Sequence, residues 1–488
     1  MIKVKNDNLK QSYSQKYGDV CFIDEAMISN TLESKKKPDS AIVRDILQKS
    51  LAIQTLTHDE AALLLNVEDE DIWQEMARAA GEVKRKVYDN RIVTFAPLYL
   101  SNLCVNDCLY CGFRKSNQQV ERIKLSLDQV KKEIEVLAGQ IGHKRLIVVY
   151  GEHPETGVDY IASTLEAISE VKVKTKHGFG QIRRSNVNAA PMSVDDLKIL
   201  KNIGIGTFQV FQETYHRPTY EKVHPKGTIK GDYLWRLYAM HRAMEAGCDD
   251  VGIGALFGLY DWKFEVMSLL SHAIELEDKF DVGPHTISFP RLEPAVNTPF
   301  AQNAPYMVND DKFRKLVIVL RLAVPYTGMI LTARENAEIR RQILPLGCTQ
   351  TDASSKIGIG TYCQQSAQHH EKQQFVLGDT RSLDNVVREL AEAGYITSFC
   401  TAGYRCGRTG DKIMDLLRCG KEGQFCKLNA VITFREWLDD FASEETKTVG
   451  EKIIAQELEE VKKRMPDRYP KLLEFYEKTK AGQRDIYF

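Results

Sequence analysis

The sequence Cys104-Val-Asn-Asp-Cys108-Leu-Tyr-Cys111 is the stretch around which the rest of the chain is organised. It places three cysteines three and then two residues apart in one short loop. Three thiolates at this spacing can hold a four-iron cubane cluster, whereas ordinary ferredoxin-type sites supply four cysteines. Because the fourth iron then lacks a protein ligand, it is open to a substrate or a cofactor. The loop therefore predicts a [4Fe-4S] cluster with one exposed iron.

The cysteine loop could also be a zinc knuckle or a set of buried free thiols. A structural zinc site needs four ligands. No fourth ligand is evident between Gly112 and Val120, the residues that follow the loop. The spacing therefore favours a cluster over zinc, and apolar packing of the thiols is the simpler alternative.

The composition is that of a protein with a sizeable hydrophobic core and balanced charge. Of 488 residues, 43% are hydrophobic, and 66 basic residues nearly cancel 67 acidic ones, for a formal net charge of -1. This balance gives no reason to expect binding to nucleic acid or to a membrane surface. No apolar run is long enough to cross a bilayer, and the first residues lack the apolar segment of a signal peptide. Eleven cysteines without an export signal indicate thiolate ligands in the cytoplasm rather than disulfides.

Helix and strand patterns divide the chain into three parts. Residues 1–90 carry apolar side chains at helical spacing, and Thr57 to Glu60 has the pattern of a capping box, so we expect a helical N-terminal extension. Residues 91–396 alternate short apolar runs with helical patterns. Residues 397–488 follow as a mainly helical C-terminal domain.

The central part contains eight strand–helix units. The predicted strands are 92–103, 146–150, 182–187, 207–211, 251–256, 286–289, 329–331 and 348–351. Such alternation implies an α/β fold with a parallel sheet, and eight units predict a closed (β/α)8 barrel of the TIM type. An open, partial barrel is the alternative, because the eighth strand has the weakest pattern.

In a barrel of this type, functional side chains lie directly after the strands, at the C-terminal mouth. The cysteine loop follows the first predicted strand, and polar residues follow several others. These residues are Gly151 and Glu152, Asn188, Gln212 and Glu213, Arg334 and Glu335, and Asp352 to Ser355, while His285 lies next to the sixth strand. Each alone would be an ordinary surface or capping residue. Their shared register predicts a site at the mouth.

Several longer stretches carry a more specific resemblance. They are Arg91-Ile-Val-Thr-Phe-Ala-Pro-Leu-Tyr, Phe211-Gln-Glu-Thr-Tyr-His-Arg-Pro-Thr-Tyr220, Asp250-Val-Gly-Ile-Gly254, Gly283-Pro-His-Thr-Ile-Ser288, Val324-Pro-Tyr-Thr-Gly-Met-Ile330 and Arg484-Asp-Ile-Tyr-Phe488. Together with the cysteine loop, they make the chain similar over nearly its whole length to the tyrosine lyases among the radical S-adenosyl-L-methionine (SAM) enzymes. The resemblance is strongest to the HydG-type maturases of [FeFe]-hydrogenase.

The resemblance implies the cofactors and the reaction. Cys104, Cys108 and Cys111 would bind a [4Fe-4S] cluster whose open iron takes SAM, with Tyr110 beside the adenine. An electron from a donor such as flavodoxin or ferredoxin would cleave SAM to methionine and a 5′-deoxyadenosyl radical. In the family this radical attacks L-tyrosine, whose Cα–Cβ bond breaks to give p-cresol and dehydroglycine (2-iminoacetate).

The resemblance also assigns roles to single residues. Glu152, after Gly151, matches the acidic residue that accepts hydrogen bonds from the SAM amino group. Arg334 matches the arginine of the substrate-binding motif, which clamps the tyrosine carboxylate with two parallel hydrogen bonds, and Glu335 adjoins it. An ion pair of Arg334 with Glu335 or Glu338 is the alternative. Polar groups of SAM or tyrosine are expected to bind Asn188, Gln212 and Glu213.

Near residue 400 the chain departs from the family. HydG-type C-terminal domains hold a second iron–sulfur cluster through a CxxC pair and a third, more distant cysteine. Cys400 and Cys426 fit this pattern, but Gly403 stands at the middle position and has no side chain to bind iron. His285 matches the histidine that binds an extra iron there; without the cluster it would be a barrel-mouth histidine or a substrate contact. The possible replacement ligands, which would require the loop to refold, are Cys406 and Cys419.

We therefore expect an enzyme, a radical SAM carbon–carbon lyase that acts on L-tyrosine. Three possibilities follow for the second cluster: it is absent, which we favour; it is held by a displaced cysteine; or its domain has another task. A retained cluster would imply onward formation of carbon monoxide and cyanide for hydrogenase maturation, with maturation partners. The alternatives are a tyrosine lyase that supplies dehydroglycine for thiazole (thiamine) synthesis and a non-catalytic maturation scaffold.

Overall fold

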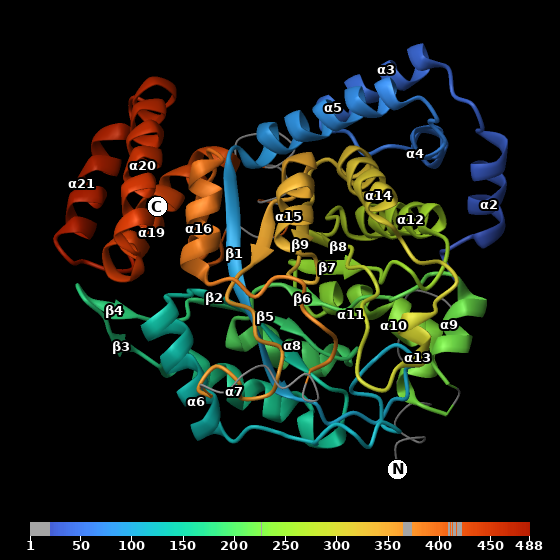
Figure 1. The fold of residues 1–488 in the computed structure, drawn as a ribbon, viewed down its shortest axis with the longest axis horizontal. Helices are drawn as coiled ribbons and strands as arrows, with labels where there is room; N and C mark the ends of the chain where they lie inside the picture. Colours follow the sequence, from blue (N-terminus) through green and yellow to red (C-terminus); the bar gives the residue numbers. More distant parts are fainter. Residues whose placement is uncertain are drawn as a thin grey trace.

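The computed structural model describes residues 20–225, 227–364, 373–407 and 422–488, together with Gly410, Lys412 and Leu416. At its centre, eight parallel strands close into a barrel with helices around it (Figure 1). In chain order the barrel strands are β1 (Arg91–Ser101), β2 (Arg145–Tyr150), β5 (Arg184–Asn188), β6 (Phe208–Gln209), β7 (Val251–Gly254), β8 (Thr286–Ser288), β9 (Gly328–Leu331) and β10 (Gln350–Asp352). β10 pairs with β1, which closes the barrel. The predicted (β/α)8 barrel is confirmed, and the alternative of an open barrel is wrong.

β1 is the strand that connects the most partners. All of its 11 residues are buried, as expected of a parallel strand covered on both faces. Its first residues pair with a further parallel strand, β11 (Ile396–Ser398), its middle pairs with β10, and its second half pairs with β2. The sequence analysis does not predict β11, which lies outside the series of eight strand–helix units. The division of the chain at residues 90 and 396 stays a prediction, and its second boundary falls inside β11.

Helices follow the barrel strands along the chain. The main ones are α6 (Leu127–Val136), α7 (Val158–Glu170), α8 (Val194–Ile203), α11 (Ala239–Glu245), α12 (Trp262–Phe280), α14 (Asp310–Ala323), α15 (Ala337–Ile343) and α16 (Leu383–Glu392). Shorter elements are the hairpin β3 (Val173–Lys174) and β4 (Phe179–Gly180), and helices α9 (Arg217–Val223), α10 (Tyr233–Leu237) and α13 (Pro299–Gln302). Ser126 and Gln129 form a capping box at the start of α6, because the side chain of each accepts a hydrogen bond from the backbone N–H of the other. Tyr238 separates α10 from α11.

The N-terminal extension is helical, as predicted. It consists of α2 (Glu25–Ser34), α3 (Ser40–Leu51), α4 (His58–Leu65) and α5 (Glu70–Tyr88), and residues 1–19 lie outside the described residues. The capping box from Thr57 to Glu60 starts α4. Helices α3, α4 and α5 pack on α14, while α2 and α4 pack on α12. The extension therefore lies along the outside of the barrel, toward the strand starts at the top of Figure 1.

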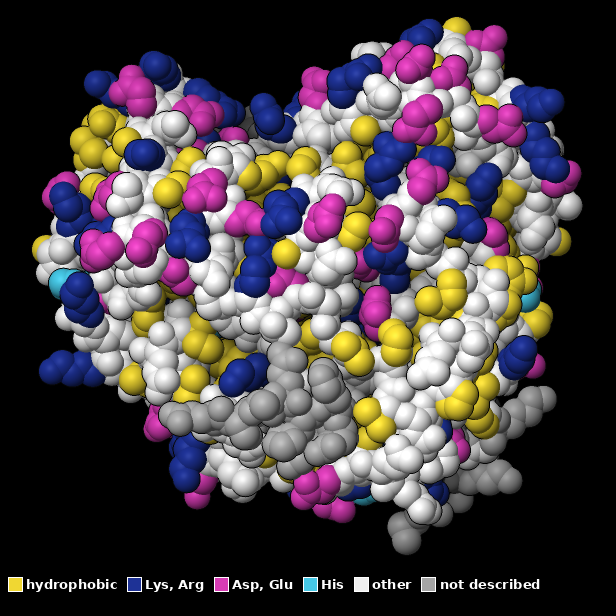
Figure 2. Space-filling view, viewed as in Figure 1, with side chains coloured by type: hydrophobic (Ala, Val, Ile, Leu, Met, Phe, Trp, Pro, Cys, Tyr) yellow, Lys and Arg dark blue, Asp and Glu magenta, His cyan; other side chains and the backbone are white. Residues whose placement is uncertain are grey.

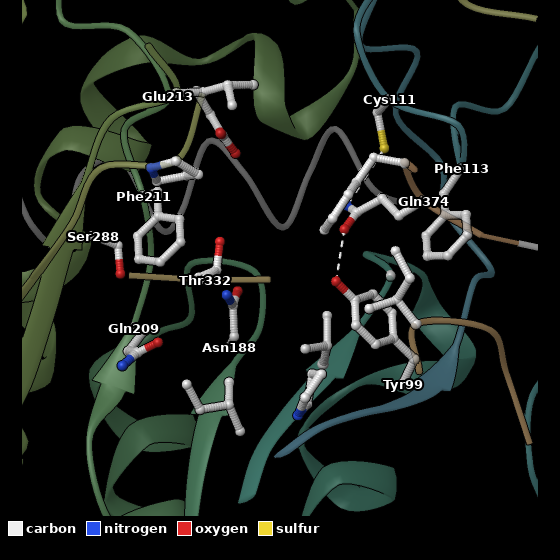
Figure 3. A pocket seen from close by; sticks show the side chains of 18 of the residues that line it. Tyr99, Cys111, Phe113, Asn188, Gln209, Phe211, Glu213, Ser288, Thr332 and Gln374 are labelled. Atoms are coloured by element: carbon white, nitrogen blue, oxygen red, sulfur yellow. Dashed lines mark hydrogen bonds between the residues drawn. The ribbon is translucent and has the colours of Figure 1, made fainter. Parts of the chain in front are cut away.

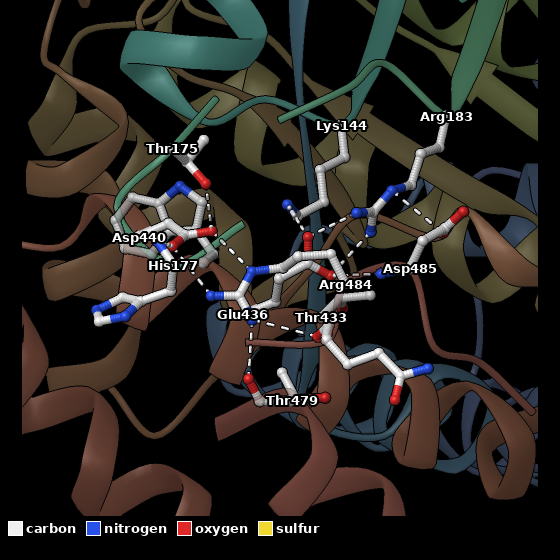
Figure 4. A network of polar contacts seen from close by, with 12 residues as sticks. Lys144, Thr175, His177, Arg183, Thr433, Glu436, Asp440, Thr479, Arg484 and Asp485 are labelled. Carbon is white, nitrogen blue, oxygen red and sulfur yellow. Dashed lines mark hydrogen bonds and ion pairs between the residues drawn. The ribbon is translucent and has the colours of Figure 1, made fainter. Parts of the chain in front are cut away.

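The C-terminal region consists of α17 (Ala402–Arg405), α19 (Glu422–Phe441), α20 (Glu444–Arg464) and α21 (Tyr469–Lys480). Buried ion pairs join it to the barrel (Figure 4). Glu436 on α19 binds Lys144 at 2.8 Å and Arg183 at 2.6 Å, and all three side chains are almost fully buried. Burial opposes the ionisation of Glu436, but the two cations prevail and lower its pKa to about 2.

The tail that resembles the family takes part in the same network. Arg484 and Asp440 of α19 form an ion pair at 2.8 Å, and neither side chain is exposed. Asp485 binds Arg183 at 3.1 Å. The stretch Arg484-Asp-Ile-Tyr-Phe488 therefore serves to hold α19 against the barrel, and this accounts in physical terms for its charged residues.

The surface mixes both signs of charge. Figure 2 shows basic and acidic side chains interspersed over the upper part of one face, as the near-zero net charge suggests. Among the residues that the structure describes, no helix combines the length and the apolar character needed to cross a membrane.

Candidate active site

A cavity opens at the C-terminal ends of the barrel strands, where the fold predicted the site. Ten of the residues proposed from the sequence line it: Cys104, Cys108, Tyr110, Cys111, Gly151, Glu152, Asn188, Glu213, Arg334 and Asp352. Figure 3 shows side chains from opposite sides of the barrel pointing into this space, among them Asn188, Ser288 and Thr332. The shared register of residues after the strands thus brought most of the proposed site together.

Backbone hydrogen bonds fix the cysteine loop at the edge of this cavity. The N–H of Val105 donates to the carbonyl oxygen of Glu152 at 2.8 Å, and the N–H of Leu109 donates to that of Val223 at 3.1 Å. The loop is therefore tied to the loop after β2 and to the end of α9. These contacts set the positions of the three thiols independently of anything bound to them.

Tyr110, the aromatic residue before the last cysteine, is held at both ends. Its ring is buried, and its hydroxyl forms a hydrogen bond of 2.7 Å with Nε2 of His224. The ring lines the cavity between Cys108 and Cys111. It offers a flat, fixed surface to an aromatic ligand.

The donor set of the loop fits a cubane cluster. Cys104, Cys108 and Cys111 carry free thiols and line one cavity. In the described part of the chain, no three His, Cys, Asp or Glu side chains surround a point where a single metal ion would be held. A four-iron cluster is wider than one ion and needs its thiolates spread around it. Three thiols at the wall of one cavity are the donor set that such a cluster requires.

Glu152 presents a carboxylate to the cavity beside the cysteine loop. Its Oε2 accepts a hydrogen bond of 2.6 Å from Nδ2 of Asn106. Burial raises the pKa of Glu152, and the nearby cations Arg236 and Lys230 oppose the rise only in part. A bound ammonium group would supply the positive charge that this buried carboxylate lacks.

Glu213 is a second cavity carboxylate, but its charge is already balanced. Its Oε1 binds Lys230 at 2.8 Å and Arg236 at 3.2 Å. Although burial acts in the other direction, these cations lower the pKa of Glu213. Its backbone is left-handed, with φ of 72°, a conformation that residues other than glycine rarely adopt. Leu256 N–H stabilises it by donating to the Glu213 carbonyl at 2.7 Å.

Gln212 is placed differently from the prediction. It is buried and absent from the cavity wall, and within the described ranges its side-chain oxygen and nitrogen have no hydrogen-bond partner. Gln209 and Phe211 line the cavity instead. Alternate residues of a strand face the same side, so Gln209 lies on the same side as Phe211. This period of two along 207–211 was the signal in the sequence that could have identified Gln209.

Arg334 is a cavity residue that stacks on an aromatic ring. Its guanidinium lies 3.3 Å from the ring centre of Phe375. Burial lowers its pKa, and nearby Tyr99 and Glu293 counteract this. Stacking of this kind fixes the plane of the guanidinium while its N–H groups stay available to a carboxylate.

Glu335 does not reach the cavity wall. Its carboxylate accepts two hydrogen bonds from Arg291, one from Nε at 2.9 Å and one from Nη2. Arg291 also forms an ion pair with Asp310 at 2.7 Å. The structure therefore does not contain the alternative ion pair between Arg334 and Glu335.

Glu293 is a cavity carboxylate that the sequence analysis did not single out. Burial and the charge of Glu335 raise the pKa of Glu293 to about 7.

The other proposed residues lie at the opposite end of the barrel. His285 comes immediately before β8, so its placement at the mouth is wrong. Its Nε2 lies 3.9 Å from Asp250, which binds Arg184 at 3.2 Å, and Nη1 of Arg184 donates to the carbonyl oxygen of Cys400 at 3.1 Å. His285 and Cys400 thus belong to one polar cluster at the strand starts.

Cys400, Gly403 and Cys426 line a second, small pocket next to α19. Two thiols and a glycine do not supply the three ligands of a cubane cluster. Cys406 is exposed and its sulfur contacts the carbonyl oxygen of Phe488 at 3.4 Å, outside this pocket. Cys419 lies outside the described residues. Among the described residues, this pocket therefore supplies two of the three thiols that the expected cluster uses.

Comparisons with known proteins agree with this geometry. Residues 98–269 match the radical SAM superfamily, and residues 288–396 match the biotin and thiamin synthesis associated domain. The chain is 31% identical to 2-iminoacetate synthase of Escherichia coli (strain K12) over 71% of its own length and 88% of that protein. A crystal structure of HydG, a maturase of the [FeFe]-hydrogenase, superposes with a TM-score of 0.90 and 48% identity, covering 96% of this chain and all of that one.

A second HydG structure, from Carboxydothermus hydrogenoformans, has a TM-score of 0.77 and 36% identity over 93% of this chain and 98% of its own. The HydG matches extend over a larger share of the chain than the 2-iminoacetate synthase match does. With three thiols at the mouth of a closed barrel and a curated relative matched along most of its length, the chain belongs to the radical SAM tyrosine lyase family, which includes 2-iminoacetate synthase and HydG.

Proposed function

We propose that the chain cleaves the Cα–Cβ bond of L-tyrosine with SAM as co-substrate, yielding p-cresol and dehydroglycine. The observation that carries this proposal is one cavity that joins three cluster-type thiols to a carboxylate, Glu152, and a guanidinium, Arg334. SAM has an ammonium group and tyrosine has a carboxylate, so the two charges are matched by opposite ones. The family supports the same reaction.

The cluster would be held by Cys104, Cys108 and Cys111, and when bound it supplies the electron that cleaves SAM. Glu152 would accept hydrogen bonds from the SAM ammonium. Gly151 allows the loop after β2 to pass close to the cysteine loop, because a Cβ at this position would lie 2.2 Å from the carbonyl oxygen of Leu103. The polar cavity residues Asn188 and Glu213 would complete the SAM site.

Arg334 would bind the tyrosine carboxylate through two parallel hydrogen bonds. Its stacking on Phe375 orients the guanidinium before substrate arrives. Glu293 is able to hold or release a proton near neutral pH and would accept one from the bound amino acid. Glu335 would act indirectly, by neutralising Arg291 close to the substrate arginine.

We propose that the product dehydroglycine leaves the barrel unchanged. In the part of the chain that the structure describes, the pocket of Cys400 and Cys426 has two thiols, which supports the proposal that onward conversion to carbon monoxide and cyanide does not take place there. Released dehydroglycine would serve thiazole synthesis or hydrolyse to glyoxylate and ammonium. The electron donor would be a flavodoxin or ferredoxin, and the cytoplasm is the compartment that keeps such thiols reduced.

The test is anaerobic reconstitution with iron and sulfide, followed by reduction in the presence of SAM and tyrosine. We expect one four-iron cluster per chain, 5′-deoxyadenosine, and p-cresol in equal amount to the tyrosine consumed. Tryptophan in place of tyrosine is the control substrate. Cleavage of tryptophan but not tyrosine would contradict the substrate assignment, and 5′-deoxyadenosine formation without any bound cluster would contradict the chemistry.

A further inference from the structure

Gln374 is a cavity residue that contacts one of the cluster cysteines. It lies between β10 and α16, in the part of that connection formed by residues 373–377. Its side-chain Nε2 donates to Sγ of Cys111 at 3.6 Å, a normal distance for a sulfur acceptor. Figure 3 shows the Cys111 sulfur directed toward this amide. The connection after the last barrel strand thus reaches across to the loop after the first.

Tyr99 at the end of β1 fixes the orientation of this amide. Its hydroxyl donates to Oε1 of Gln374 at 3.0 Å (Figure 3). Because Oε1 accepts from the tyrosine, the NH2 group is the side that faces the sulfur. Burial raises the pKa of Tyr99, so the hydroxyl keeps its proton and remains a donor.

The backbone brings the two segments equally close. Gly112, directly after Cys111, donates its N–H to the carbonyl oxygen of Gln374 at 3.2 Å. A Cβ at Gly112 would lie 2.8 Å from that oxygen and 2.9 Å from the carbonyl oxygen of Gln373, closer than real Cβ atoms come. Gln373 in turn pairs with Gly358 as an isolated antiparallel bridge. The contact between Gln374 and Cys111 is therefore part of a close, glycine-dependent junction.

We propose that Gln374 is a positioning residue for Cys111, and that its N–H···S hydrogen bond raises the reduction potential of the cluster. This inference rests on the proposed function, since it presumes that the three cysteines bind the cluster. Reduction adds negative charge that is shared by the ligand sulfurs, so a donor to one sulfur stabilises the reduced form more than the oxidised form. Tyr99 contributes by holding the amide in the donating orientation.

Asn106 offers a similar contact but a poorer test. Its Nδ2 lies 3.8 Å from Sγ of Cys104 and also donates to Glu152 at 2.6 Å. A substitution of Asn106 would therefore disturb the carboxylate proposed to bind SAM. Gln374 bonds to Tyr99 and Cys111 and can be changed without touching Glu152.

The experiment compares Gln374→Leu with the unchanged chain and with Gln373→Leu as a matched control. Each protein is reconstituted anaerobically and assayed for iron and sulfide, and the cluster is titrated by electron paramagnetic resonance at fixed potentials without SAM. We expect Gln374→Leu to lower the ratio of reduced to oxidised cluster about tenfold, as one ordinary hydrogen bond would. For a one-electron couple, tenfold corresponds to a potential about 59 mV more negative. Gln373→Leu should leave the potential unchanged.

A second variant, Tyr99→Phe, removes the hydrogen bond to the Gln374 amide but keeps the amide itself. The reduction potential of the cluster should therefore shift in the same direction as in Gln374→Leu, and by less. In the double variant, Tyr99→Phe should add nothing to Gln374→Leu, because Tyr99 acts through the amide. Loss of iron from Gln374→Leu but not from Gln373→Leu would also support the positioning role. Equal potentials in Gln374→Leu and the unchanged chain, or an equal shift in Gln373→Leu, would overturn it. Failure of the unchanged chain to bind any cluster would instead overturn the proposed function and, with it, this inference.

Discussion

The two ends of the barrel carry similar residue types and differ in what those residues can hold. At the C-terminal mouth, three thiols stand around a cavity with Glu152 and Arg334 on its walls. At the strand starts, Cys400 and Cys426 share a small pocket with Gly403, next to an arginine that is already paired with Asp250. Glu152 and Arg334 line the cavity at the first end, while Asp250 and Arg184 form an ion pair at the second. The number of thiols that an end supplies, rather than the presence of the domain around it, decides whether that end can hold a cubane cluster.

Loss of one mouth thiol should have the largest effect. Cys108→Ala leaves two ligands, so we expect loss of the four-iron cluster and no measurable 5′-deoxyadenosine. Cys426→Ala at the other end should keep SAM cleavage at the level of the unchanged chain. The measurement is iron content together with 5′-deoxyadenosine under reducing conditions. Equal loss in both variants would mean that the two ends are not chemically distinct.

Breaking the ion pair between the barrel and α19 should cost stability rather than chemistry. Glu436→Leu leaves Lys144 buried without its carboxylate partner and removes one of the two carboxylates that bind Arg183, and breaking a buried ion pair in this way typically costs about 3–5 kcal/mol. Since the pKa of Glu436 is about 2 in the folded chain and 4.5 is its ordinary value, its contribution is present above pH 4.5 and is lost as pH falls toward 2.

Denaturant unfolding at neutral pH and near pH 3 checks this prediction, and the gap between the two proteins should narrow in acid. At low temperature, Glu436→Leu should still cleave SAM per folded chain, because the cavity lies at the other end. Unaltered stability at neutral pH would show that α19 is held by other contacts.

Substitution of Arg334 should separate substrate binding from cofactor cleavage. Arg334→Ala removes two charge-assisted hydrogen bonds, each worth about 1.5–3 kcal/mol, so we expect kcat/KM for tyrosine to fall by at least about 100-fold. Arg334→Lys keeps the charge without the paired geometry and should recover part of this. SAM affinity, measured by its effect on the cluster spectrum, should change little. Loss of SAM binding in both variants would place Arg334 in the cofactor site instead.

Gly403→Cys should have the smallest effect on tyrosine cleavage at the mouth, because residue 403 lies in the small pocket at the strand starts. The variant tests whether a third thiol is what that pocket needs to hold a cluster. A third thiol beside Cys400 and Cys426 would complete the family pattern, and iron should rise from about four to about eight atoms per chain if a second cubane forms. Carbon monoxide release is the second readout. A second cluster and carbon monoxide from the unchanged chain would show that another ligand replaces the missing thiol.

The barrel was predictable because its signal is repeated. Seven strand–helix units have clear periodicity, and even the weak strand near residue 350 was recognised by its place in the series. β11 escaped because its three residues pair with Arg91 to Val93, far away in the chain, and a pairing partner is not visible in local sequence. The positions of Glu152, Asn188 and Arg334 at or after the ends of predicted strands also indicated that they line the cavity at the mouth.

The errors in the site have one physical origin: sequence gives the end of a strand but not the direction of each side chain. Gln212 was proposed for the site and Gln209 was not, and His285 was counted with the mouth residues although it directly precedes its strand. Glu335 was assigned with its neighbour, although Arg291 draws its carboxylate away. Gln374 carries no local signal at all, since only the folded connection brings it to Cys111.

The pairing of β1 with three strands has a consequence for how the molecule is assembled. Val93 pairs with Gln350 and with Ser398, so the first barrel strand waits for partners that are synthesised much later. Contacts of such long separation are slow to form, and an open strand edge can pair with another chain in the meantime. Expression yield should therefore depend on temperature and on chaperones that shield strand edges. Once closed, β1 should contain the slowest-exchanging amide hydrogens in the protein.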